Sequence, residues 1–525
     1  MNRFLKKLIC VGCISLFAIG CTENEPQKEI EPITLTWYIN FSWFDKSWGL
    51  DAVSKYITEQ TGVHVEYVMP SGDESQQIQR FLTQGITADI ITLDAWDTTY
   101  GDFLEQNALA PLDVLAEEFG HSFMEDTNAE TVQWYTHFDH LYVYPNASFP
   151  PSTKQEYSNQ SFLVRKDIYE AIGSPDMTTP EGFLQALEDA KNYMPMVDGL
   201  PLIPLGMGEF TSTGNVSLEE YLQNFLAILH EVDGAIYDRY MHPDYIMWLE
   251  TLNEANRRGL ILPDIFLDKR VQIEEKIAEG RYFAMLYQWA DCTEQLQEIY
   301  ASRPEQIYIA IDGPKNANGD DHTLAGSSIQ GWTVTGISST SKNQEAALRL
   351  LSFLKSDEGQ KLIFLGVEDH GYTMEDGVPQ LTPEAEKMLR ENRAEYDKVY
   401  GGDATHWPMM DNLYGDIHKY HLPEESYIEN IMEWSRLYTE NFSLYAYQDV
   451  ILEAEAWEAK LKDDERKSKL FVELILAETK EQFYEIWESY VQQREADHFD
   501  SVLEARQKQL DENKPRLVGD NNGGD

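Results

Sequence analysis

An alternation of strand and helix patterns at the start of the globular part limits the possible folds of this chain most strongly. Residues 33–40 (ITLTWYIN) and 63–68 (VHVEYV) alternate as strands do, and residues 49–57 between them have the apolar spacing of a helix. A second helix around residues 78–82 precedes a third strand at residues 88–93 (ADIITL). This βαβαβ order indicates a parallel sheet with helices on its faces. Ligands of such sheets bind beyond the carboxyl ends of the strands, where Asn40, Trp43, Asp94, Trp96 and Asp97 follow.

Strand and helix patterns continue along the rest of the chain. Residues 306–311 and 331–337 read as short strands, and residues 344–354 read as an amphipathic helix. The last hundred residues or so contain no convincing strand, and residues 427–438, 445–461, 467–477 and 481–509 predict four successive helices. Residues 515–525 are polar and rich in glycine toward their end, so we expect a disordered tail.

The N-terminus has the layout of a cleaved export signal. Arg3, Lys6 and Lys7 precede an apolar run at residues 8–20, which is shorter than the roughly 20 apolar residues of a membrane span. Residues 18–21 (AIGC) resemble the lipobox of bacterial lipoproteins, with Ala18 where that family usually has Leu, Val or Ile. The resemblance implies removal of residues 1–20 and acylation, including palmitate, of Cys21. Residues 21–32 would then form a flexible tether.

The charge and the cysteines exclude several classes of protein. The net charge is −50, from 91 acidic and 41 basic residues, and such a surface repels nucleic acids and anionic lipid headgroups. Of the four cysteines only Cys292 lies beyond the leader and its junction, so no disulfide can form within the globular part. We expect Cys292 to be a small buried apolar residue.

Five stretches of the chain together resemble one family. They are residues 88–113 (ADIITLDAWDTTYGDFLEQNALAPLD), 161–191 (SFLVRKDIYEAIGSPDMTTPEGFLQALEDAK), 257–268 (RRGLILPDIFLD), 277–291 (IAEGRYFAMLYQWAD) and 331–366 (GWTVTGISSTSKNQEAALRLLSFLKSDEGQKLIFLG). In this order they resemble the extracellular solute-binding proteins of ABC importers, in the sugar-binding group of Gram-positive lipoproteins. The likeness extends from residue 33 to about residue 514.

The resemblance implies an α/β, two-lobed fold like that of periplasmic binding proteins of type II, with a helical C-terminal part. We expect discontinuous lobes, with residues 33–145 and about 300–340 in lobe 1 and residues 146–299 and 341–514 in lobe 2. The family captures a polar solute between the lobes and delivers it to the transmembrane subunits of a permease. The chain would be a monomer on the extracellular face of the cell membrane, without a cofactor. Some members carry a calcium loop, but residues 192–204 hold one carboxylate, Asp198, so we expect no metal.

A sugar site needs flat aromatic rings for the C–H faces of the sugar and polar groups for its hydroxyls. Trp37 lies inside a strand and is expected in the core, while Trp434 and Trp457 are expected to pack between helices. The candidate ligand-binding residues are those that follow strands or begin them: Trp43, Asp94, Trp96, Tyr287, Trp289, Asp291, Trp332 and Trp407.

Two other functions compete with oligosaccharide capture. One is a surface-anchored glycoside hydrolase, although G-x-S-x-G, H-E-x-x-H and P-loop motifs are absent, and paired acids carry little information among 91 acidic residues. The other is a peptide-binding or sensing lipoprotein of the same fold. The sequence therefore favours a binding protein over an enzyme.

Overall fold

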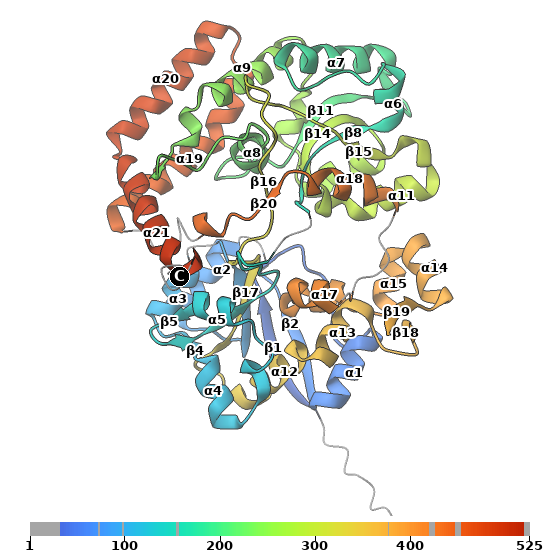
Figure 1. Cartoon of the computed structure of the whole chain (residues 1–525), viewed down its shortest axis with the longest axis vertical. Helices are drawn as coiled ribbons and strands as arrows, with labels where there is room; N and C mark the ends of the chain where they lie inside the picture. Colours follow the sequence, from blue (N-terminus) through green and yellow to red (C-terminus); the bar gives the residue numbers. More distant parts are fainter. Residues whose placement is uncertain are drawn as a thin grey trace, which may run out of the picture.

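The computed structural model describes residues 32–71, 74–96, 99–153, 157–375, 377–418, 420, 426–446 and 453–518. They form two lobes, one above the other in Figure 1. The leader, Cys21, most of the tether, Asp97 and the end of the tail lie outside the described residues. Within the described ranges, no helix combines the length and the apolar character that crossing a membrane requires.

Lobe 1 is built on a mixed sheet in the order β2–β1–β3–β17–β4, where β4 is Leu109–Ala110, and β7 (Val143–Pro145) also pairs with β17. β1 (Ile33–Ile39), β2 (Val63–Val68) and β3 (Ile90–Asp94) run parallel, and β17 (Thr333–Ser338) pairs antiparallel with β3. α1 (Ala52–Thr61) and α2 (Glu74–Gln84) connect the parallel strands. The predicted βαβαβ order is therefore confirmed.

Local chemistry explains where α1 begins and ends. The side chain of Asp51 accepts a hydrogen bond from the Ser54 amide at 2.7 Å, so it caps the first turn. Gly62, with φ 67°, takes the left-handed conformation that ends the helix and leads into β2. Trp37 in β1 is fully buried, and its indole N–H donates to Thr92 at 2.8 Å, which confirms the core prediction.

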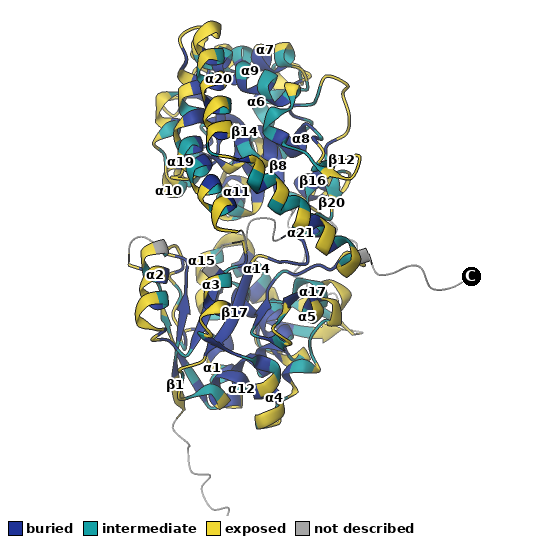
Figure 2. Ribbon diagram, turned by 90° about the vertical axis from the view of Figure 1, so that its left-hand side faces the viewer, coloured by how far each residue is buried: buried dark blue, intermediate teal, exposed yellow. Residues whose placement is uncertain are grey.

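Lobe 2 contains a four-stranded sheet in the order β11–β14–β8–β15. Its strands are β8 (Gln160–Arg165), β11 (Ile203–Met207), β14 (Tyr282–Gln288) and β15 (Tyr308–Ala310). Every residue of β8 is buried, as expected for a strand covered on both faces. α7 (Pro180–Tyr193) and α9 (Pro243–Arg257) contribute apolar faces to one core of this lobe. Figure 2 shows the buried strands at the centre of each lobe.

The remaining elements cover these sheets or extend from them. In lobe 1 they are α3 (Thr99–Glu105), β4 (Leu109–Ala110), α4 (Leu112–Phe119), α5 (Ala129–Tyr135), β7 (Val143–Pro145), α12 (Gln344–Lys355) and α13 (Asp357–Leu365). In lobe 2 they are α6 (Lys166–Ala171), η2 (Ser217–Tyr221), α8 (Leu222–Phe225), α10 (Arg270–Ala278), α11 (Thr293–Ser302) and α18 (Ser426–Arg436). The chain after α13 forms β18 (Tyr372–Glu375), β19 (Val378–Leu381), α14 (Pro383–Glu391), α15 (Arg393–Val399), α16 (Asp403–His406), η7 (Trp407–Met409) and α17 (Asn412–His418), and η7 adds Trp407 and Met409 to the core of lobe 1.

Two of the expected lobe boundaries are wrong. Residues 308–310 form β15, which pairs with β8 and so belongs to the sheet of lobe 2. Residues 344–365 form α12 and α13, whose apolar side chains join the core of lobe 1. The physical reason is the same in both cases: each segment pairs with or packs on the nearest unsatisfied sheet edge or face, and the sequence pattern does not say which sheet that is.

The C-terminal part is helical, as predicted, but the helices are divided differently. α19 (Ala454–Leu476) is one continuous helix where two were expected, and α20 (Lys480–Ala496) and α21 (Asp500–Val518) are two helices where one was expected. The break between α20 and α21 occurs at His498, whose φ of 58° does not continue a helix.

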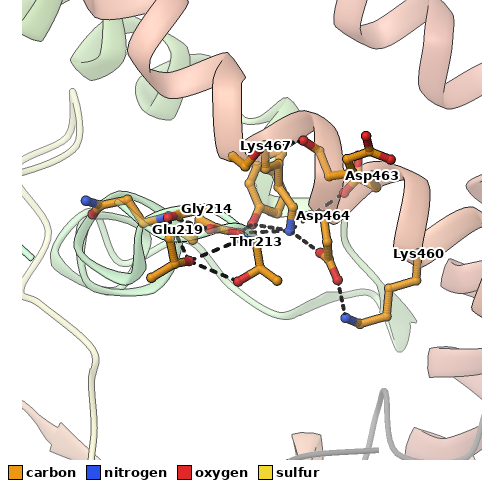
Figure 3. Close-up of polar contacts among 12 residues, drawn as sticks. Thr213, Gly214, Glu219, Lys460, Asp463, Asp464 and Lys467 are labelled. Carbon is orange, nitrogen blue, oxygen red and sulfur yellow. Dashed lines mark hydrogen bonds and ion pairs between the residues drawn. The ribbon is translucent and has the colours of Figure 1, made fainter. Parts of the chain in front are cut away.

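α19 is fixed to lobe 2 by buried ion pairs (Figure 3). The Lys467 ammonium lies 2.8 Å from a carboxylate oxygen of Glu219 in η2 and 2.9 Å from Asp464. Lys460 pairs with the other oxygen of Asp464 at 2.6 Å. Because these charges are largely desolvated, the contacts hold α19 in one register against the lobe.

Three segments that connect the lobes lie side by side. Asn146 donates from its amide to Thr333 O in lobe 1, and Ser158 at the other end of the same segment donates its hydroxyl to Ala325 O. β16 (Leu324–Ala325) pairs in parallel with β20 (Thr439–Glu440) on the third segment. These bonds therefore join the three connecting segments to one another and to the first residue of β17.

Candidate ligand-binding site

Four aromatic side chains form one cluster at the edge of the lobe 1 sheet. Trp43 follows β1, Trp332 precedes β17, and their rings are nearly parallel, at 8°, with centroids 6.1 Å apart. Trp407 in η7 lies 4.6 Å from Trp332 and 5.6 Å from Trp43. Phe41 lies 5.6 Å from both Trp332 and Trp407. Residues separated by more than 360 positions in the sequence therefore build one aromatic surface, which we call the tryptophan platform (Phe41, Trp43, Trp332 and Trp407).

The platform is buried on one side and open on the other. Trp43 is 47% exposed and Trp332 is 39% exposed, whereas Trp407 is only 6% exposed and supports them from below. Trp96, which follows β3 at the same sheet edge, is 52% exposed. Single exposed aromatic residues are ordinary, but three tryptophans gathered at one edge form an apolar patch of the kind that binds a partner or ligand.

Hydrogen bonds hold Trp96 and the backbone next to Trp332 and Trp407. The indole N–H of Trp96 donates to Gly331 O at 2.9 Å, and the Trp96 amide donates to Asp94 at 2.7 Å. Asp94 therefore caps the turn after β3. Asn146 accepts from the Thr333 amide at 2.8 Å and donates to Trp407 O at 3.1 Å. These bonds orient the Trp96 ring and position the backbone that carries Trp332 and Trp407, while ring contacts position Trp43.

Gly331 is required next to this platform. Its φ is 70°, and a Cβ there would lie 2.1 Å from Asn146 O. Only glycine adopts this conformation at low cost and allows the connecting segment to approach so closely. The turn at Gly331 places Trp332 at the start of β17 with its ring on the open side of the sheet edge.

The candidates predicted in lobe 2 have a different environment. Tyr287 and Trp289 are 5% and 6% exposed and pack in the core below α11 and α18. The indole of Trp289 donates to Ser158 O at 2.8 Å, so this residue joins β14 to a connecting segment. The structure does not support a stacking role for either ring, because neither presents a face to solvent.

Asp291 belongs to a network of ion pairs and hydrogen bonds on lobe 2. It accepts a hydrogen bond from Gln288 at 2.7 Å and lies 3.3 Å from the guanidinium of Arg270. Arg270 in turn pairs with Glu274 at 2.7 Å. The structure thus brings Trp43, Asp94, Trp96, Trp332 and Trp407 together in lobe 1, and it places Tyr287, Trp289 and Asp291 apart from them in lobe 2.

Sequence reasoning missed an acidic residue on lobe 2. Glu220 is exposed, and its carboxylate accepts a hydrogen bond from Gln160 at 2.8 Å. Gln160 opens β8 directly after a connecting segment, so Glu220 lies at the edge of the lobe 2 sheet nearest the connections. Surrounding protein desolvates the carboxylate and raises its pKa, although the charge of Arg239 opposes this effect.

The backbone at Glu220 explains why it was missed. Residues 218–229 have the apolar spacing of an ordinary helix, but residues 217–221 form a π-helix that continues as α8. In a π-turn each residue is rotated away from its α-helical position, which changes the face on which a side chain lies. The adjacent pair Glu219–Glu220 was the one available signal in the sequence.

Other expectations about single residues can be compared with the structure. Cys292 is fully buried, and burial raises the pKa of its thiol, which confirms the core prediction. Trp434 stacks on Phe225 at 5.7 Å and donates to Asp312 at 3.0 Å, so it packs between elements as expected. No group of three or more His, Cys, Asp or Glu residues in the described ranges is arranged to hold a metal ion.

Comparison with known proteins supports the two-lobed fold. No family model matches this sequence, and no curated protein resembles it significantly. Among solved structures, the alginate-binding protein AlgQ2 without calcium ion matches with a TM-score of 0.67 at 15% identity, over 92% of this chain and 98% of its own. The chain has the fold of the solute-binding proteins of ABC transporters.

Two further structures with this solute-binding-protein fold are equally extensive matches. The Streptococcus pneumoniae (S.pneumoniae) ABC-transporter substrate-binding protein FusA in complex with kestose has a TM-score of 0.67 at 15% identity, over 91% of this chain and 99% of its own. An HMO-binding solute-binding protein from Bifidobacterium longum infantis has a TM-score of 0.63 at 15% identity, with the same coverage. The predicted α/β, two-lobed fold with C-terminal helices is confirmed.

Proposed function

We propose that this chain is the non-catalytic solute-binding component of an ABC importer and that it captures an oligosaccharide between its lobes. The observation that carries the proposal is the tryptophan platform, because the half-exposed, nearly parallel rings of Trp43 and Trp332 are suited to the C–H faces of sugars. Structures of the same fold include one in complex with kestose and one in complex with Man1GlcNAc.

The platform offers ring faces for the C–H groups of a sugar, and polar side chains at the two sheet edges offer hydrogen bonds for its hydroxyl groups. Trp43, Trp96 and Trp332 on lobe 1 offer apolar area, and Asp94 lies beside them. Glu220 and Gln288 on lobe 2 offer oxygen and nitrogen atoms for hydroxyl groups. Closure of the lobes about the connecting segments would bring these two sets of groups onto opposite sides of one ligand.

Attachment to the membrane is part of the same proposal. After export, Cys21 would carry the lipid and residues 22–32 would link it to lobe 1, so that the solute is released next to the permease subunits. Replacement of Cys21 by Ser should move the protein from the membrane fraction to the medium. Retention of the Cys21→Ser variant on the membrane would contradict the lipid anchor.

A thermal-shift screen of oligosaccharides and peptides tests the binding function, because a ligand that binds only the folded state raises the apparent melting temperature. We expect one or more oligosaccharides to raise it and to quench tryptophan fluorescence. Incubation of the same oligosaccharides with the protein should produce no new reducing ends. Peptide binding without sugar binding, or the appearance of reducing ends, would contradict the proposal.

A further inference from the structure

Glu220 differs from the acidic residues around it because no basic side chain in the described ranges forms an ion pair with it. Glu219 pairs with Lys467 at 2.8 Å, Asp291 pairs with Arg270 at 3.3 Å, and Glu209 pairs with Lys269 at 2.6 Å. Glu220 has one printed polar contact, the hydrogen bond that Gln160 Nε2 donates at 2.8 Å. Glu220 is exposed as a residue, and a carboxylate with one hydrogen bond has lone pairs left to accept more.

The cation whose charge acts on Glu220 is the buried Arg239. Arg239 is 9% exposed, and its guanidinium nitrogens lie 2.5 Å from Asn224 Oδ1 and 3.1 Å from His230 Nε2. Asn224 also donates to Gln160 at 3.0 Å, so the same network that buries Arg239 holds the Gln160 amide toward Glu220. The network therefore orients Glu220 without placing a positive charge on the surface beside it.

Two basic side chains near the two sheet edges already have acidic partners. On lobe 2, Arg270 is held between Glu274 and Asp291, at 2.7 Å and 3.3 Å. On lobe 1, Lys46 after Trp43 lies 3.7 Å from Asp45. A ligand carboxylate that approaches Arg270 or Lys46 would therefore compete with an acid that already pairs with that side chain.

We propose that Glu220 makes the site selective for uncharged, hydroxyl-rich oligosaccharides and against oligosaccharides that carry carboxylates. A hydroxyl group donates a hydrogen bond to the Glu220 carboxylate, whereas a ligand carboxylate is repelled by it. This inference rests on the proposed function and adds a ligand class to it. It also separates this chain from the alginate-binding protein of the same fold, since alginate is a polymer of sugar acids.

The test compares three forms of the full chain on matched ligands. They are the unchanged protein, Glu220→Gln, and the control Glu298→Gln, which removes the same charge from an exposed position on α11. The ligands are neutral oligosaccharides (maltotetraose, xylotetraose, kestose and mannose-containing glycans) and acidic ones (tetragalacturonate and an alginate tetrasaccharide). Calorimetry gives each affinity, and thermal melting without ligand verifies that each variant is folded.

We expect the unchanged protein and Glu298→Gln to bind a neutral oligosaccharide at least tenfold more tightly than any acidic one. Glu220→Gln should reduce this ratio by about tenfold or more, because it keeps a polar side chain and removes the repulsion. Tighter binding of an acidic oligosaccharide by the unchanged protein, or the same ratio in Glu220→Gln and Glu298→Gln, would overturn the inference and leave oligosaccharide binding in place. Binding of no oligosaccharide by any of the three would overturn the proposed function itself, and the inference with it.

Discussion

Replacement of Trp43 by Ala tests the tryptophan platform most directly. A tryptophan buries about 150–250 Å² when covered completely, and 47% of Trp43 is accessible, so a ligand can cover on the order of 100 Å² of it. At about 25 cal/mol per Å², complete cover contributes roughly 2.5 kcal/mol, and a sugar on part of the ring contributes less. We therefore expect Trp43→Ala to cost about 1–2.5 kcal/mol of binding free energy, or roughly 5- to 60-fold in Kd.

The same structure predicts that the fold survives this change. Trp43 already faces solvent over nearly half its area, so its removal should lower the free energy of unfolding by about 1–2 kcal/mol through lost ring contacts. Trp407 lies beneath it and is 6% exposed, so Trp407→Ala should cost about 3–5 kcal/mol of stability instead. Trp332→Ala should resemble Trp43→Ala in both respects, because Trp332 is 39% exposed.

Calorimetric titration with an oligosaccharide that passes the thermal-shift screen measures the affinity, and urea unfolding measures the stability. Trp457→Ala on α19 is the matched control, since it removes an indole far along the chain from the platform and should leave the affinity unchanged. The reasoning is refuted if Trp43→Ala and Trp332→Ala are both folded and both bind within twofold of the unchanged protein. A loss of binding in Trp457→Ala equal to that in Trp43→Ala would also refute it.

Three further predictions follow from other parts of the molecule. Trp289→Ala should lower the free energy of unfolding by about 3–5 kcal/mol in urea unfolding, because the ring lies in the core of lobe 2. The ligand affinity of the folded protein should stay within a few-fold. An unchanged stability with lost binding would contradict this prediction. Burial alone would raise the pKa of Asp464, but Lys467 and Lys460 lower this pKa below its ordinary value of 3.8. The ionised Asp464 carboxylate therefore contributes its full stabilisation above pH 3.8, and this contribution is lost as the pH falls through the lowered pKa. Asp464→Asn should therefore destabilise the protein at pH 7 more than at pH 2–3 in urea unfolding, and an equal loss at both pH values would count against the ion pairs. Arg516 at the end of α21 donates to Trp134 O at 2.8 Å and lies 4.6 Å from the Trp134 ring in lobe 1. Arg516→Ala should therefore speed amide hydrogen exchange in the last turn of α21 and in α5, without a comparable change in α20. An equal change in exchange across all three helices would argue against this contact.

Local patterns in the sequence were sufficient for the elements whose partners are close in the chain. The alternation in β1, β2 and β3 and the apolar stripe of α1 need only neighbours within about 60 residues, and they predicted the parallel core of lobe 1 correctly. The burial of Trp37 and the packing of Trp434 also followed from their positions within a strand and a helix, and the burial of Cys292 followed from its residue type.

Which sheet a segment joins was decided by tertiary structure alone. β15 and α12 have unremarkable strand and helix patterns, and each could have packed on either lobe until pairing and burial selected one. The division of the C-terminal helices likewise depended on a backbone turn at His498, a residue type that carries no strong turn signal.

The candidate site shows the same division most clearly. Composition alone determined that the chain is acidic, and periodicity alone predicted the βαβαβ order with tryptophans after its strands, because both are local properties; the two-lobed fold was implied by the resemblance to solute-binding proteins. Whether each tryptophan became a platform or part of a core depended on contacts between residues hundreds of positions apart: Trp332 and Trp43 remained half-exposed, while Trp289 was covered by α11 and α18. The accessibility of Glu220 depended on a π-helix and a buried arginine, and only the folded chain brings those together.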